Sequence, residues 1–179
     1  MTPFPATRSV PVRFAFVALS VWSVAGALHA QDLPPGVALG MTPDGLRAAL
    51  PTVERVARPV RIAGGLAGNW RGRPDMVAGL PFEPTFYFAG NALRRVEWVA
   101  VLPETYGNGD RGAAAYAGLV EWGRARFGTE MASRDPGSEL ASWADGDTDV
   151  YAQRTDDPRR GAGVRLVYRQ RRLKDASQL

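Results

Sequence analysis

Residues 82–102 alternate between apolar and polar side chains, the period-two pattern of half-buried β-strands. Two runs, 82–88 and 95–102, flank the turn-forming pair Gly90-Asn91 and predict a hairpin with one buried face. The expected buried set is Phe82, Pro84, Phe86, Phe88, Val96, Trp98, Ala100 and Leu102, with Arg95, Glu97 and Val99 on the opposite face. Because proline cannot donate a ladder hydrogen bond, Pro84 also predicts an edge or a bulge on one side of its strand.

Helical patterns precede each group of predicted strands. Residues 43–50 read as a short helix, with Thr42 as the N-cap, Pro43 at the first helical position and Pro51 ending it. Residues 112–127 carry an apolar stripe at helical spacing, and Gly128 is placed to terminate that helix. We therefore expect these two segments to be scaffold.

The remaining patterns complete two similar halves. Residues 52–62 are a candidate strand, and the glycine-rich residues 63–75 are expected to be a loop. Further strands are predicted at 139–144, 149–155 and 164–173, the first two joined by a turn at Asp145-Gly146. The sequence thus predicts an α+β fold made of two tandem helix-plus-three-stranded antiparallel sheet repeats in one compact unit. The first repeat would span residues 31–105 and the second residues 106–179.

The first thirty residues have the features of an export signal. Arg8 and Arg13 precede an apolar run from Phe14 to Leu28, which is shorter than the ~20 residues of a membrane-spanning helix. Cleavage is expected after Ala30, with a cut after residue 27 as the alternative. The mature chain is therefore predicted to be periplasmic and to have no transmembrane segment.

Composition excludes several kinds of chemistry. The chain has 22 basic and 18 acidic residues, and loss of Arg8 and Arg13 with the signal leaves 20 against 18. It contains no cysteine, and its one histidine, His29, lies in the predicted signal. Histidine- or thiolate-based nucleophilic dyads, zinc sites and iron–sulfur sites are therefore excluded from the mature chain, and no cofactor or metal is expected. Carboxylate chemistry or no catalysis remains, and we expect a protein that is not an enzyme.

Two stretches together carry a resemblance to a known family. LGMTPDGLRAALP (39–51) followed by FYFAGNALRRVEW (86–98) resembles the small outer-membrane assembly lipoproteins of the SmpA/OmlA (BamE) type, which pack helices on a three-stranded sheet. The tandem arrangement is similar to the β-lactamase inhibitor protein fold. The likeness covers residues 36–102 by motif and 112–173 by element order, but the lipid-attachment cysteine is missing. The resemblance implies a non-catalytic envelope module that binds other envelope proteins.

A candidate partner-binding segment is Asn69-Trp70-Arg71-Gly72-Arg73, and its proposed binding residues are Asn69, Trp70, Arg71 and Arg73. Tryptophan and arginine often anchor protein interfaces. The alternative is that Trp70 folds back onto the core as a lid.

A second candidate is an anion-binding stripe formed by Arg165, Arg169 and Arg171 in the last predicted strand. Guanidinium groups match phosphate oxygens, so lipopolysaccharide or another anionic glycolipid is a possible ligand. The alternative is a solvated strand face whose charges discourage aggregation. Nucleic acid is not expected, because export would separate the protein from it.

Acidic residues offer the remaining candidates. Asp145, Asp147 and Asp149 alternate as in a calcium loop, but the glycine and the twelfth residue, Asp156, do not fit, and an acidic hairpin turn explains them. Together with Glu139 they are the material for a carboxylate hydrolase, a remote alternative that needs two carboxylates about 5–10 Å apart.

Overall fold

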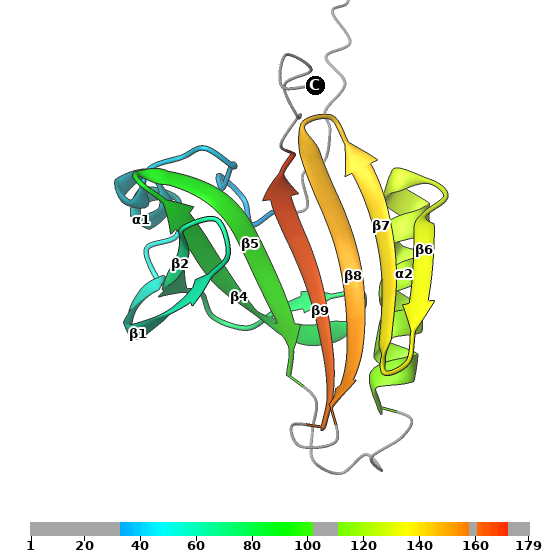
Figure 1. The fold of residues 1–179 in the computed structure, drawn as a ribbon. Coiled ribbons are helices and arrows are strands. Elements are labelled where there is room, and N and C mark those ends of the chain that lie inside the picture. The colour runs from blue at the N-terminus through cyan, green and yellow to red at the C-terminus, as the bar shows by residue number, and fades with distance from the viewer. Residues whose placement is uncertain (1–32, 102–110, 158–160, 172–179) are drawn as a thin grey trace, which may run out of the picture.

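The computed structural model describes residues 33–101, 111–157 and 161–171. They form two helices and nine strands (Figure 1). The elements are α1 (Pro43–Ala49), β1 (Glu54–Ile62), β2 (Leu66–Arg71), β3 (Asp75–Val77), β4 (Leu80–Ala89), β5 (Ala92–Ala100), α2 (Arg111–Phe127), β6 (Met131–Asp135), β7 (Ser138–Asp145), β8 (Thr148–Asp157) and β9 (Gly161–Gln170).

All nine strands belong to one antiparallel sheet. Its order is β1-β2-β4-β5-β9-β8-β7-β6, and the short β3 pairs with β4 beside β2. The two ends of the sheet are therefore β1 and β6, and the middle is the pairing of β5 with β9, from Arg95 opposite Arg169 to Val99 opposite Arg165 (Figure 1). Strands from the two halves of the chain meet at this central pair.

The predicted pair of three-stranded repeats is wrong. The first half supplies five strands and the second supplies four, and all of them join one continuous sheet. Alternation along a strand shows which side chains share a face, but it does not show which strand lies alongside. The edges that would have ended two separate sheets, those of β5 and β9, pair with each other instead.

Three strands were not anticipated: β2, β3 and β6. The expected loop at 63–75 contains β2, in which Gly68 lies under the ring of Tyr87, and no side chain larger than hydrogen would fit there without moving that ring. β6 was also missed, because its five residues are all exposed and show no apolar alternation. Short strands of this kind are defined by their neighbours rather than by their own pattern.

Pro84 does not lie on an edge strand, since β4 has neighbours on both sides. Its position is nevertheless special. On one side of β4 the neighbouring strand changes from β2, which ends opposite Thr85, to β3, which starts opposite Phe82. Pro84 lies in this gap, where a missing backbone donor removes no ladder hydrogen bond.

Several local predictions are confirmed. Thr42 caps α1, its hydroxyl accepting from the backbone N–H of Gly45 at 3.1 Å. The 82–102 hairpin corresponds to β4 and β5, with Glu97 and Trp98 on opposite faces; Leu102 lies outside the described residues. Gly128 follows α2 with φ of 83°, a left-handed conformation that suits glycine.

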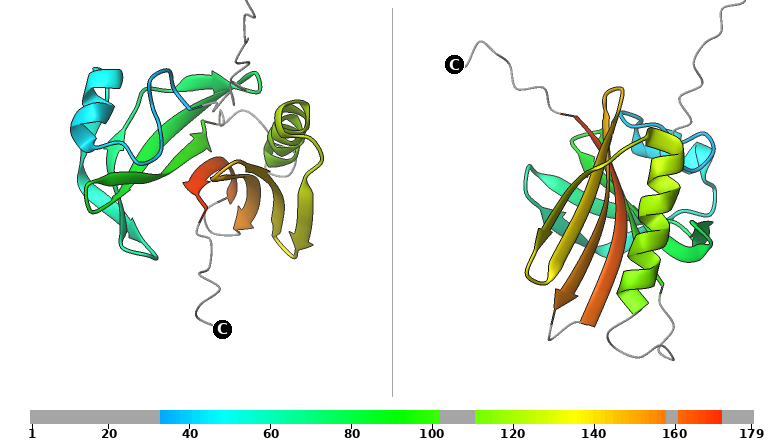
Figure 2. Two further views of the ribbon diagram at one scale, coloured as in Figure 1. Left: turned by 90° about the horizontal axis from the view of Figure 1, so that it is seen from above. Right: turned by 90° about the vertical axis from the view of Figure 1, so that its right-hand side faces the viewer.

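The hydrophobic core lies between the sheet and its two helices. Both helices are on the same side of the sheet, α1 behind the first half and α2 behind β7, β8 and β9 (Figure 2). The core's largest fully buried side chains include Tyr168, Phe82, Phe86, Leu46 and Leu119. The opposite sheet face carries no helix among the described residues, and we call it the open face.

Neither of the two described helices has the length and apolar character required to cross a membrane. The predicted signal peptide, residues 1–30, lies outside the described part of the chain, and so does the predicted boundary between residues 105 and 106.

Candidate binding surface

The centre of the open face is built by β5, β8 and β9. Residues directly opposite each other in neighbouring strands share a face. The register places Glu97, Val167 and Tyr151 in one row across these strands, and Arg95, Arg169 and Asp149 in the next. Charged and aromatic residues therefore meet where the two halves of the chain join.

Glu97 is the centre of an ion-pair network on this face. It is only 7% exposed, although neither of the two described helices covers it. The Arg95 guanidinium donates to Glu97 Oε2 at 2.8 and 3.2 Å, and Arg165 donates to Glu97 Oε1 at 3.0 Å. Arg165 also donates to the Gln153 side-chain oxygen at 2.7 and 2.9 Å, so both arginines are fixed in position.

Two tyrosines extend this network. The Arg95 guanidinium carbon lies 5.8 Å from the ring centre of Tyr87 and 5.7 Å from that of Tyr151, and Arg169 lies 5.6 Å from Tyr151. These distances allow cation–π attraction. Burial of the Tyr87 ring, and next the negative charge of Glu97, raise the pKa of its phenol above the usual 10.0. The tyrosine therefore stays neutral and able to donate a hydrogen bond at physiological pH.

The side chains of this layer cover apolar surface. Val167 is 0% exposed, yet it belongs to the open face, in register with Glu97 and Tyr151. Long arginine and tyrosine side chains can bury apolar atoms beneath them while their polar ends remain at the surface. The open face thus has an ordered polar layer over a small apolar floor.

The predicted anion stripe is brought together, but its charges are engaged. Arg169 and Arg171 both donate to Asp149, at 3.2 and 2.9 Å, and Arg165 is held by Glu97 and Gln153. Each of the three guanidinium groups therefore has an acceptor from the protein itself. The three arginines share one face, as predicted, and their binding to an anionic glycolipid stays a prediction.

The predicted segment at 69–73 is divided between the two faces. Trp70 belongs to β2 and is half-buried against the helix-side core, where Arg47 lies 5.9 Å from its ring centre. Arg71 is on the open face and pairs with Glu83 at 2.6 Å, while Arg73 is exposed after the strand ends. Asn69 lies at the register shift between Gly68 and Trp70. These four residues do not form one surface.

Of the carboxylates considered for hydrolysis, Glu139 lies far from Asp145. Glu139 and Asp145 are six residues apart on β7, which corresponds to roughly 20 Å along an extended strand. Glu139 lines an open hollow of about 440 Å³ beside the β6–β7 turn, but Arg134 and Arg154 hold its carboxylate at 2.6 and 3.4 Å. Asp145-Gly146 forms the predicted turn between β7 and β8. Across the described residues, no cluster of three potential metal ligands occurs.

Sequence reasoning missed the tyrosines of the open face. Arg95 and Glu97 were assigned to the polar side of their strand, which is a usable signal. Tyr87 lies opposite Arg95 in the predicted β4–β5 hairpin, whereas Tyr151 reaches Arg95 only through the pairing of β5 with β9 and of β9 with β8.

The chain matches no protein-family model, no curated protein and no solved structure.

Proposed function

We propose that the protein is an exported, periplasmic, non-catalytic module that binds another envelope protein through the open face. The observation that carries this proposal is the ordered Arg–Tyr–Glu layer centred on Arg95 and Glu97. Arginine and tyrosine, together with tryptophan, are enriched at the energetic centres of protein interfaces. Because these side chains are already held in place, binding would cost little further side-chain entropy.

The charge of the face indicates the chemistry of the partner. Its ion pairs connect five arginines, Arg71, Arg95, Arg165, Arg169 and Arg171, to three carboxylates, Glu83, Glu97 and Asp149. Within this network the positive charges exceed the negative charges by two, which favours a partner that brings acidic residues to it. Such residues would take the guanidinium donors that the internal carboxylates leave unused.

Export supports the same proposal from the sequence side. The charged n-region and apolar run of residues 1–30 are those of a signal peptide, and the resemblance to envelope assembly lipoproteins implies protein binding. The exclusion of histidine and cysteine chemistry from the mature chain leaves few routes to catalysis.

Photo-crosslinking in producing cells tests this proposal. A crosslinker at Val99, which is 45% exposed and lies opposite Arg165, should give one discrete protein adduct. The charge reversal Arg169→Glu should weaken the adduct at least tenfold, since it removes a cation from the face. Adduct yield is measured by blotting and the partner is identified by mass spectrometry.

Two controls make the outcome decisive. A crosslinker at Arg126, on α2 behind the sheet, should not give the same adduct, and Arg134→Glu, at the far edge of the sheet, should leave the Val99 adduct unchanged. Equal adducts from Val99 and Arg126, or lipid adducts alone from Val99, would overturn the proposal.

A further inference from the structure

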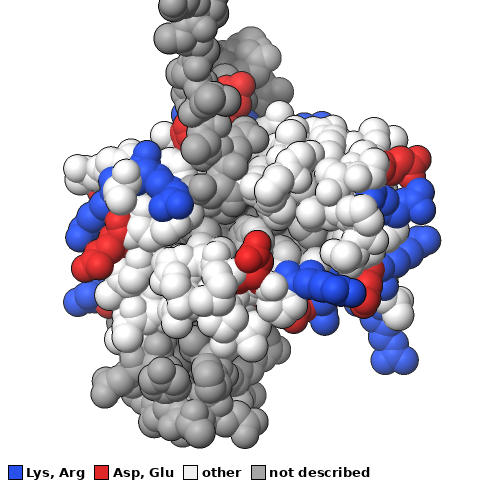
Figure 3. All heavy atoms as spheres, turned by 180° about the vertical axis from the view of Figure 1, so that it is seen from behind, with Lys and Arg blue, Asp and Glu red and all other residues white. Residues whose placement is uncertain are grey.

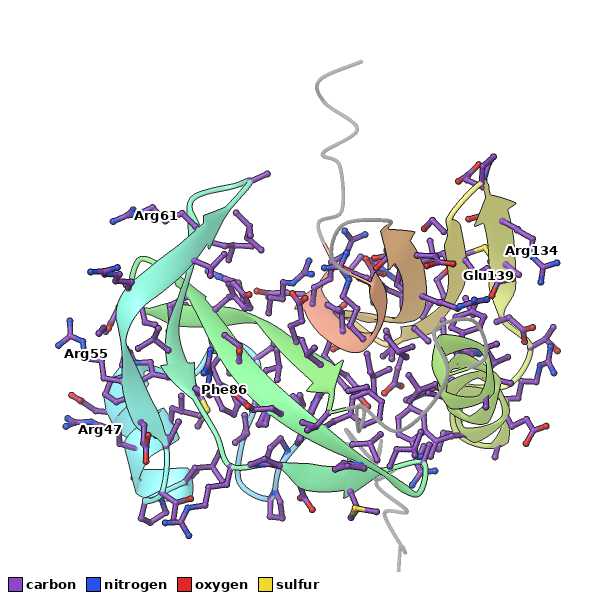
Figure 4. The ribbon with its side chains drawn as sticks, turned by 90° about the horizontal axis from the view of Figure 1, so that it is seen from below. Arg47, Arg55, Arg61, Phe86, Arg134 and Glu139 are labelled. Atoms are coloured by element: carbon purple, nitrogen blue, oxygen red, sulfur yellow. The ribbon has the colours of Figure 1, made fainter. Side chains whose placement is uncertain are left out.

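A second charged surface lies at the edge of the sheet, away from the open-face network. β1 is a terminal strand, and it contains Arg55, Arg58 and Arg61. All three are exposed, and Figure 4 shows Arg55 and Arg61 pointing outward along the same margin of the molecule as Arg47 of α1. We call Arg55, Arg58 and Arg61 the β1 arginines.

Unlike the arginines of the open face, the β1 arginines have no partner among the described residues. Within the described part of the chain, none of the three forms an ion pair or a side-chain hydrogen bond, and their strand has one acid, Glu54. The neighbouring Arg47, by contrast, is paired with Asp44 at 2.6 Å. In the view from the helix side, several basic side chains lie at the α1 and β1 end of the molecule, beside acidic ones (Figure 3). These are cations available to an external anion.

The strand is poorly suited to accept another strand. Pro59 lacks a backbone donor, and the register with β2 shifts between Arg55 and Val60, so the strand is irregular through its middle. Proline, irregular pairing and charge each interrupt edge-to-edge pairing. An occupant of this edge must therefore bind through the side chains rather than through a backbone ladder.

The surface also lacks the anchor of a specific protein interface. β1 contains no aromatic residue, and its most exposed large apolar side chain is Val60, at 58%. Hot spots of protein interfaces usually center on buried aromatic or arginine anchors in pockets. Exposed guanidinium groups along a strand edge instead fit a continuous surface of phosphates, which arginine can bind in many positions.

We propose that the β1 arginines bind the phosphate groups of an anionic lipid bilayer. This inference does not depend on the proposed protein-binding function, because it uses different residues at a different part of the sheet. It places the edge of the sheet against the membrane surface and leaves the open face accessible.

Vesicle binding tests the proposal. The protein is purified as cells produce it, so that all variants share one N-terminus, and is mixed with vesicles of phosphatidylcholine alone or with phosphatidylglycerol added. We expect binding that requires phosphatidylglycerol and weakens in high salt. Replacing all three β1 arginines by glutamine should lower the affinity about a hundredfold, given the usual contribution of each cation near an anionic surface.

A matched variant separates the edge from net charge. Arg94→Gln, Arg126→Gln and Arg134→Gln together remove the same three charges from other exposed positions and should retain most of the binding. Replacing the β1 arginines by lysine should also retain most of it. Far-UV circular dichroism confirms that each variant is folded. The proposal is overturned if phosphatidylglycerol does not increase vesicle binding by the unmodified protein. It is also overturned if the Arg94, Arg126 and Arg134 variant loses as much affinity as the variant with the β1 arginines replaced by glutamine.

Discussion

Gly123 shows how one residue sets the distance between a helix and the sheet. A side-chain carbon at this position of α2 would lie 2.4 Å from Cζ2 of Trp143 on β7. The indole cannot easily move away, because its Nε1 donates to the backbone oxygen of Gly128 at 2.9 Å and its ring contacts Phe127. Glycine here is required by close packing.

We predict that Gly123→Ala lowers the free energy of unfolding by about 1–3 kcal/mol, the usual cost of overpacking, although alanine is the better helix former. Gly118→Ala is the control, since nothing lies within 4 Å of its added carbon. It should raise stability by up to about 1 kcal/mol. Urea unfolding of both variants measures the difference, and two changes of the same sign would contradict this account of the packing.

At the scale of single elements, the pattern of apolar, polar and capping residues predicted an element where one of its faces is buried and the other is exposed. Thr42 and Pro43 identified the start of α1, and the alternation from Phe82 onward identified β4 and β5. It failed for β2, whose burial depends on the Tyr87 ring over Gly68, and for β6, which is exposed throughout. Their secondary structure comes from neighbours far along the chain.

The candidate surface was predictable only in part, for a similar reason. The polar face of β5 could be expected to carry Arg95 and Glu97. The contact between Arg165 and Glu97 could not be predicted. The two residues are 68 positions apart, and the contact depends on β5 lying beside β9. The arginine stripe was identified correctly as a set of neighbours, but its acidic partner Asp149 comes from β8.

The network around Glu97 gives a prediction for β5 and β9. Glu97→Ala would leave Arg95, with its side chain 13% exposed, and Arg165 without their shared carboxylate. We expect a loss of about 3 kcal/mol, the lower end for breaking a buried pair, because solvent still screens Arg165.

Glu83→Ala is the matched change, since it removes a more exposed carboxylate from Arg71 on the same face. It should cost less than about 1 kcal/mol. Thermal unfolding of the two variants measures this difference. Equal losses of stability would show that the ion pairs of Glu97 contribute no more than the exposed pair of Glu83 and Arg71.

For the whole molecule, one sheet implies one folding unit. Trp98 and Leu166 face each other across the central pair and belong to one buried cluster that also includes Leu46 and Val150 from opposite ends of the fold. The two halves therefore share both backbone hydrogen bonds and core.

We predict that Leu166→Ala lowers stability by about 2–5 kcal/mol, as for other fully buried leucines. Tryptophan fluorescence and far-UV circular dichroism should still report a single transition with one midpoint. Separate midpoints for the two probes would indicate that the halves unfold independently.

The central position of β9 also has a consequence for how the chain is made. Of the nine strands, β9 is synthesised last, yet it fills the middle of the sheet, between β5 and β8. Until its residues emerge, β5 and β8 each present an unpaired edge, and Glu97 has yet to meet Arg165. Contacts between such distant segments form slowly, and the nascent chain stays open to other strands in the meantime. A chain stopped shortly before Gly161 would therefore lose the centre of its sheet rather than a peripheral strand, and with it the surface that we propose binds a partner.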